Sequence, residues 1–204
     1  MKPIIIVAAS ALLGLAAPSV AQPRPSGDWP CRQVKVPSVA VAGVWTGPAI
    51  DDAAKQRLRE DLALGELAAR ISARRTPVEE AQKVVETFAA AAGDKRKERL
   101  TALFAGVYER LEAERREVID GLERYGAKQR QLAEKLRDES EALRAEQDKT
   151  PQDAQKVSRA SESLQWDLRV FDERRNALAY VCETPALIEQ RLGALARAIE
   201  AAID

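Results

Sequence analysis

Histidine is missing from this sequence of 204 residues, the single methionine is Met1, and only two cysteines are present. The side chains that most often bind zinc, copper, haem or iron–sulfur clusters are therefore nearly absent. A serine hydrolase would lack its histidine base, and the chain has neither a glycine-rich phosphate-binding loop nor an EF-hand loop. We expect no metal site, no cofactor and no catalytic residues, and we interpret the protein as a non-enzyme.

Aromatic residues are scarce and the charge is balanced. Phe, Trp and Tyr make up 4% of the chain, and charged residues make up 31%, with 32 basic and 32 acidic side chains. This composition is typical of long solvated helices that share a narrow apolar seam, whereas strands would need more aromatic and β-branched residues. Zero net charge gives no reason to expect nucleic acid or an anionic membrane as the main partner. Any membrane contact would be peripheral.

The first 21 residues have the pattern of a secretory signal peptide. Lys2 precedes an apolar run at residues 4–17, and Ser19 and Ala21 are small residues at the two positions that a signal peptidase inspects. We predict cleavage after Ala21 and a periplasmic location for residues 22–204. The alternative is an uncleaved anchor, although the run is short for a membrane span.

The two cysteines, Cys31 and Cys182, lie on either side of most of the remaining chain. Lone cysteines in an oxidising compartment usually pair, so we predict a disulfide between them. The alternative is a redox-active or metal-bound thiol, but neither cysteine belongs to a CxxC motif and no histidine is present.

Residues 22–50 differ from the rest and predict an extended N-terminal arm. Five prolines exclude a helix there, namely Pro23, Pro25, Pro30, Pro37 and Pro48. The arm also carries Trp29 and Trp45, whose large apolar rings favour burial. We expect both rings to dock on the helices near Cys182.

The longest helix-forming stretch spans residues 94–147, with Asp94 as its expected cap. It contains no proline, and its apolar residues recur every three to four positions. Its second half keeps the four-three spacing of a coiled-coil seam, at Val118, Leu122, Tyr125, Gln129, Leu132, Leu136, Glu139 and Leu143. A helix of about 80 Å needs a partner along its length.

Residues 151–182 carry the matching seam, at Val157, Ser161, Leu164, Leu168, Phe171, Arg175, Leu178 and Cys182. Only a short turn separates the two stretches, so they should run antiparallel, with opposed residue numbers summing to about 300. This register places Cys182 beside Val118.

Three shorter helices complete the prediction. The first spans 51–74, is capped by Asp51 or Asp52, and buries a stripe of Leu58, Leu62, Leu64, Leu67 and Ile71. The second follows the capping box at 76–79 and ends at Gly93, and the last spans 186–203. Three Thr-Pro pairs should mark helix starts, since proline fits the first turn: Thr76-Pro77, Thr150-Pro151 and Thr184-Pro185.

The sequence therefore predicts an all-α fold with three parts after the signal peptide. The extended Pro-rich N-terminal arm spans 22–50. A small antiparallel helical bundle combines 51–117 with 183–204, and a long coiled-coil helical hairpin, 118–182, projects from it. The last two parts form one helical domain, 51–204.

A projecting hairpin acts by reach and by the side chains that it presents, so we interpret the protein as a periplasmic adaptor or assembly factor that binds an envelope protein. Trp166 and Tyr180 should point away from the seam and are the predicted partner-binding residues. The alternative is a small-molecule-binding protein or enzyme with a site between the arm and the bundle, near Trp29, Trp45 and Tyr125. A holdase chaperone is a further alternative. We expect a monomer, with a homo-oligomer as the alternative.

Overall fold

The computed structural model describes residues 27–203, and every regular element in this part of the chain is helical. The elements are η1 (Val41–Gly43), α1 (Asp52–Glu60), α2 (Leu62–Ser72), α3 (Val78–Ala92), η2 (Gly93–Lys95), α4 (Arg96–Gln147), α5 (Ala154–Val181) and α6 (Thr184–Ala201). The all-α prediction is confirmed. The predicted signal peptide, 1–21, and the start of the arm, 22–26, lie outside the described residues.

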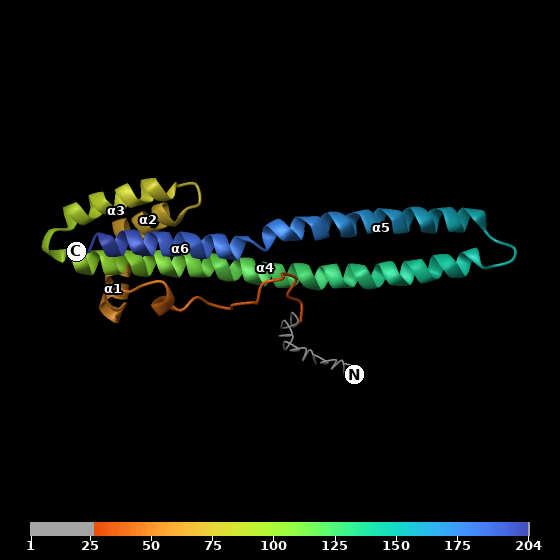
Figure 1. The fold of residues 1–204 in the computed structure, drawn as a ribbon, viewed down its shortest axis with the longest axis horizontal. Coiled ribbons are helices and arrows are strands. Elements are labelled where there is room, and N and C mark those ends of the chain that lie inside the picture. The colour runs from red at the N-terminus through yellow and green to blue at the C-terminus, as the bar shows by residue number, and fades with distance from the viewer. Residues whose placement is uncertain (1–26, 204) are drawn as a thin grey trace, which may run out of the picture.

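Helix α4, with 52 residues, runs the length of the molecule (Figure 1). Helix α5 returns antiparallel along its distal half, as the seam pattern predicted, and α6 continues along its proximal half. The predicted cap at Asp94 is wrong, because Gly93–Lys95 form a turn of 3₁₀ helix and Lys95 is the N-cap without a side-chain hydrogen bond. The helix therefore begins two residues later than expected.

In the bundle, α2, α3 and α6 pack around the proximal half of α4. Helix α1 contacts the same half of α4 from the side opposite to α6 (Figure 1). Its core consists of apolar side chains from all these helices. The largest fully buried members are Leu64, Ile71, Val85, Leu100, Leu103, Phe104, Val107, Leu111, Leu192, Leu195 and Ile199. This core surrounds the proximal half of α4, and the hairpin of α4 and α5 projects beyond it (Figure 1).

The predicted first helix, 51–74, is two helices. Asp61 takes an extended backbone conformation, ends α1, and accepts a hydrogen bond from the Leu64 backbone N–H at 3.0 Å, which caps α2. Because an N-cap residue has non-helical dihedral angles, the chain turns there. The predicted burial of Leu62 is wrong as a consequence, since its side chain is 76% exposed at the corner. Asp51 caps α1 as predicted.

The three Thr-Pro pairs behave differently. Pro185 lies in the first turn of α6, as predicted. The capping box at 76–79 is wrong: Pro77 is the N-cap, and the Thr76 hydroxyl donates instead to the Arg70 carbonyl at the end of α2. Helix α5 begins after Thr150-Pro151 at Ala154, because Asp153 accepts from two backbone N–H groups there.

The arm is bonded to the helical body by the Cys31–Cys182 disulfide, which confirms the predicted pairing. Trp29 packs in the same small cluster, with Ile119 and Leu122 of α4, so its predicted place near Cys182 is also confirmed. The expected place of Trp45 is wrong. Its ring stacks on Phe104 in the bundle core, with centroids 3.9 Å apart.

Three side chains of α4 hold the arm through its backbone. Tyr108 donates its hydroxyl to the Val39 carbonyl at 2.6 Å, and the Glu112 carboxylate accepts from the Val39 N–H. Arg115 donates to the Val36 carbonyl at 2.7 Å. Burial, followed by the charge of Glu112, raises the pKa of Tyr108 above its ordinary value. The arm is thereby held on α4 from its disulfide to the bundle.

Candidate functional site

The hairpin of α4 and α5 is thin, because only two helices share its seam. None of the α5 residues Ala154–Val181 is buried, and Leu136, at 7% exposed, is the only buried residue of α4 beyond Leu122. The eight predicted seam positions of α4 are all buried or half-buried, which confirms that face. The hairpin therefore presents most of its surface outward.

Hydrogen bonds between side chains and backbone fix the register of the hairpin. Gln129 donates its amide to the Phe171 carbonyl at 2.9 Å, and the Tyr125 hydroxyl donates to the Arg174 carbonyl at 2.9 Å. These pairs agree with the predicted rule that opposed numbers sum to about 300. Val118 also packs against the cluster that contains Cys182, as predicted.

A charged cluster connects the helices nearer the tip. Lys135 of α4 bridges to Asp167 of α5 and to Glu139 on its own helix. Its hydrogen bonds to Asp167 and then to Glu139 raise the pKa of Lys135. One oxygen of Glu139 and the side-chain oxygen of Gln129 are buried without a hydrogen-bond partner among the described residues. The polar side chains that fix the register therefore also destabilise the seam, because two of their buried oxygens lack a hydrogen bond within residues 27–203.

Two predicted seam positions of α5 are wrong. Leu168 is 45% exposed, and the Arg175 side chain also lies in solvent. Asp167, whose side chain is mostly covered, faces α4 in place of Leu168, while the predicted position Phe171 is half-buried as expected. The half-buried positions Leu164, Asp167 and Phe171 are therefore spaced three then four, where the predicted seam had four then three.

The predicted partner-binding residues are both exposed. Trp166 is 63% exposed and Tyr180 is 78% exposed. Trp166 lies two positions after the half-buried Leu164, and Tyr180 lies four turns further along the helix, so both are on the side of α5 away from α4. An outward tryptophan on a two-helix hairpin has no core to enter.

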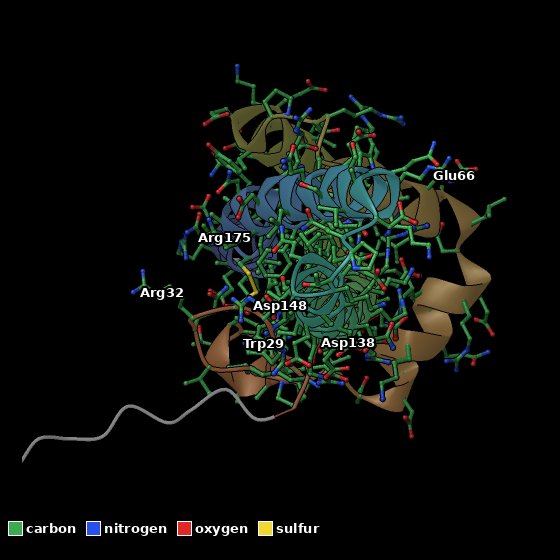
Figure 2. The ribbon with its side chains drawn as sticks, turned by 90° about the vertical axis from the view of Figure 1, so that its right-hand side faces the viewer. Trp29, Arg32, Glu66, Asp138, Asp148 and Arg175 are labelled. Atoms are coloured by element: carbon green, nitrogen blue, oxygen red, sulfur yellow. A yellow bond between two sulfur atoms is a disulfide. The ribbon has the colours of Figure 1, made fainter. Side chains whose placement is uncertain are left out.

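The three aromatic residues of the alternative ligand site do not form one pocket. Trp45 lies in the bundle core, Trp29 belongs to the disulfide cluster, and Tyr125 takes part in the hairpin register. A hollow of about 360 Å³ does open beside the disulfide, between residues 30–33 and the end of α5. Arg32 extends from it into solvent (Figure 2). Two other polar side chains in the lining are already paired: Gln33 donates to the Cys182 carbonyl, and Arg175 pairs with Asp172.

A second hollow, of about 520 Å³, lies between α2 and α4 on the bundle. Its lining includes small residues of both helices together with Leu58 of α1 and the exposed Leu62. The sequence prediction missed this region because it placed Leu62 in a buried stripe. The signal that could have located it is Asp61, a favoured N-cap residue in the middle of that stripe.

Residues 27–203 contain no group of three or more His, Cys, Asp or Glu side chains placed to hold a metal ion. None of the helices in this part of the chain is long and apolar enough to cross a membrane. Comparison with protein-family models, with curated proteins and with solved structures finds no match to this chain.

Proposed function

We propose that the protein is a periplasmic adaptor or assembly factor that binds an envelope protein through the outer face of its hairpin. The observation that supports this most is the exposure of Trp166 and Tyr180 on the side of α5 away from α4. Aromatic side chains of this kind dominate the binding energy of protein interfaces. The hairpin adds reach, because it extends the molecule well beyond the bundle core.

The filled space under the arm also supports interaction over a small-molecule site. Trp29 and the disulfide fill the contact between the arm and the hairpin root, and Trp45 fills the contact with the bundle. Small-molecule sites are usually concave, with a few polar groups aimed at the ligand. In the hollow beside the disulfide, Gln33 and Arg175 are already paired within the chain, and Arg32 extends into solvent.

The proposed location rests on the signal-peptide pattern of residues 1–21 and on the Cys31–Cys182 disulfide. Structural disulfides persist mainly in oxidising compartments such as the periplasm. A cleaved signal is testable by the N-terminal sequence of the purified protein, which should begin at Gln22.

The binding test is capture from an envelope extract by the tagged protein and by Trp166→Ala/Tyr180→Ala. The double variant should lose a partner that the unmodified protein retains, because both rings are removed from the surface without disturbing the seam. Leu187→Ala on α6 is the matched control, since Leu187 is also exposed, at 58%, but lies on the bundle. Equal capture by all three proteins would contradict the proposal.

A further inference from the structure

Gly65 of α2 is a helical glycine without a packing reason inside the described chain. A Cβ atom on Gly65 would have no heavy atom within 4 Å, whereas a Cβ on Gly106 would lie 2.8 Å from Leu58 and 2.9 Å from Ala68. Glycine inside a helix costs about 0.5–1 kcal/mol relative to alanine. Close packing within residues 27–203 therefore explains why position 106 is glycine. It does not explain why the destabilising glycine at position 65 is there.

Gly65 lies in the lining of the 520 Å³ hollow between α2 and α4. Small residues of both helices, Gly65 and Ala69 of α2 and Ala113 of α4, contribute to this lining, and Leu58 of α1 adds an apolar side chain. Small side chains leave room for another backbone or a large apolar side chain to approach closely. Leu62, which also lines the hollow, is the most exposed large apolar side chain of the bundle, at 76%.

Charged side chains of both signs surround the hollow. Glu66 of α2 and Glu109 and Arg110 of α4 contribute to its lining. None of the three has an ion-pair partner within the described residues. A rim that carries both signs can pair with a copy of itself, whereas a rim of one sign would repel its copy.

We infer that a second copy of this chain docks on the hollow between α2 and α4 and forms a twofold dimer. In a twofold interface the same patch faces itself, so that one patch must hold both the projecting group and its receptor. Here Leu62 projects beside a hollow lined by small residues. Leu62 of each copy enters the hollow of the other, Gly65 lets the two α2 helices approach, and Arg110 pairs with the acidic rim of its partner.

The test is sedimentation velocity of the full secreted chain, with its disulfide intact, over a wide micromolar range. The unmodified protein should shift from monomer to dimer as its concentration rises. Leu62→Asp should stay monomeric, because it places a charge in the apolar hollow of the partner. The matched control is Leu187→Asp, an exposed leucine on α6 away from the hollow, which should dimerise like the unmodified protein.

Gly65→Ala gives a second, independent readout. Alanine meets no atom within its own chain at this position, so the variant should unfold at the same or a higher temperature while its dimer dissociates more readily. If Gly65 had only a role within its own helix, Gly65→Ala would leave the dimer as tight as that of the unmodified protein. Arg110→Glu should also weaken the dimer, most clearly at low salt, because its rim becomes wholly acidic.

An unmodified protein that sediments as a monomer at every concentration would overturn the inference. So would a Leu62→Asp or Gly65→Ala protein that dimerises as tightly as the unmodified chain. If Leu62→Asp fails to fold, Gly65→Ala and Arg110→Glu still decide the matter. The result is independent of partner capture by the hairpin, because Trp166 and Tyr180 do not line the hollow.

Discussion

The Nε atom of Arg115 on α4 lies 2.6 Å from the Glu189 carboxylate on α6, and the Arg115 side chain is only 3% exposed. The same guanidinium donates to the Val36 carbonyl of the arm. One buried side chain therefore joins the arm, the long helix and the last helix. Only the Arg115 side of the pair is buried, since the Glu189 side chain is 40% exposed. Loss of Glu189 would therefore leave a buried charge unpaired, whereas loss of Arg115 removes hydrogen bonds to two other elements.

Arg115→Ala should lower the free energy of unfolding by about 2–4 kcal/mol. The substitution leaves the Val36 carbonyl without its donor and removes the only described ion-pair partner of Glu189. Glu189→Gln is the comparison: its amide oxygen can still accept from Arg115, but the buried guanidinium loses the carboxylate that pairs with it, so this variant should also be destabilised, by less than Arg115→Ala because the bond of Arg115 to the arm is kept. Urea unfolding followed by far-UV circular dichroism measures both, and equal midpoints for the two variants would contradict the role assigned to Arg115.

Reduction of the Cys31–Cys182 disulfide should lower the unfolding free energy while leaving the bundle helical. The bond joins residues 151 apart in sequence, and on the chain-entropy model a loop of that size stabilises by roughly 5 kcal/mol at most. The bundle core, which includes Trp45, is a different apolar cluster from the one that contains the disulfide. The helical content should therefore persist after reduction. Thermal melts with and without reductant, and the Cys31→Ala/Cys182→Ala variant, test this. A reduced protein that loses its helical signal at room temperature would show that the bundle depends on the bond.

The sequence predicted the long helix and the hairpin register because each depends on a pattern repeated over many residues. It predicted the disulfide because the chain offers only one pair of cysteines. It missed the break at Asp61 and the place of Trp45, where one local interaction decides the outcome. At Asp61, a cap overrides a continuous apolar stripe. At Trp45, stacking on Phe104 draws the ring into the bundle. The exposed hollow beside Gly65 depends on how α2 meets α4, which no local pattern contains.

Removal of residues 130–170, with Gln129 and Phe171 joined by a short linker, should leave a folded and cooperatively melting protein. These two residues already face each other through the Gln129 hydrogen bond, so the linker spans a short distance. The disulfide cluster, with Leu122 and Leu178 around it, is retained. Calorimetry of the shortened chain measures the result. A broad, non-cooperative transition would show that the distal hairpin belongs to the core.

Acid should loosen the start of α5 before it unfolds the bundle. The Asp153 carboxylate accepts from the Lys156 and Gln155 backbone N–H groups, and the bond from Lys156 is the main cause that lowers the pKa of Asp153. A lowered folded-state pKa means that the stabilisation is fully present above the ordinary pKa of about 4 and is lost as the pH falls through the lowered value.

Amide hydrogen exchange at the start of α5, corrected for intrinsic rates, should therefore accelerate as the pH falls below about 4. Asp153→Asn should remove most of this pH dependence while it keeps a side-chain acceptor for the cap. The start of α6, whose N-cap residue Glu183 makes no side-chain cap hydrogen bond, serves as an internal comparison. Exchange in α5 that is equally fast at neutral pH and in acid would contradict the role of this cap.

The polar groups in the hairpin seam give the last prediction. Gln129→Leu with Glu139→Leu should raise the melting temperature, because it removes two buried oxygens that have no hydrogen-bond partner among the described residues. The hydrogen bond from Gln129 to the Phe171 carbonyl and the ion pair of Glu139 with Lys135 are lost as well, so the gain should be modest, about 1 kcal/mol at most. Thermal denaturation measures the change in stability.

Sedimentation of the same double variant distinguishes two roles for those polar groups. If they fix the register of two helices within one chain, the variant should associate no more than the unmodified protein, because each seam residue of α4 already faces α5. If they instead mark a face that receives a third helix, the added leucines should drive further association. We expect the first outcome, since Gln129 and Lys135 each bond directly to α5. The single variant Gln129→Asn is the control: its shorter amide should break the bond to Phe171 and lower stability without changing the association state.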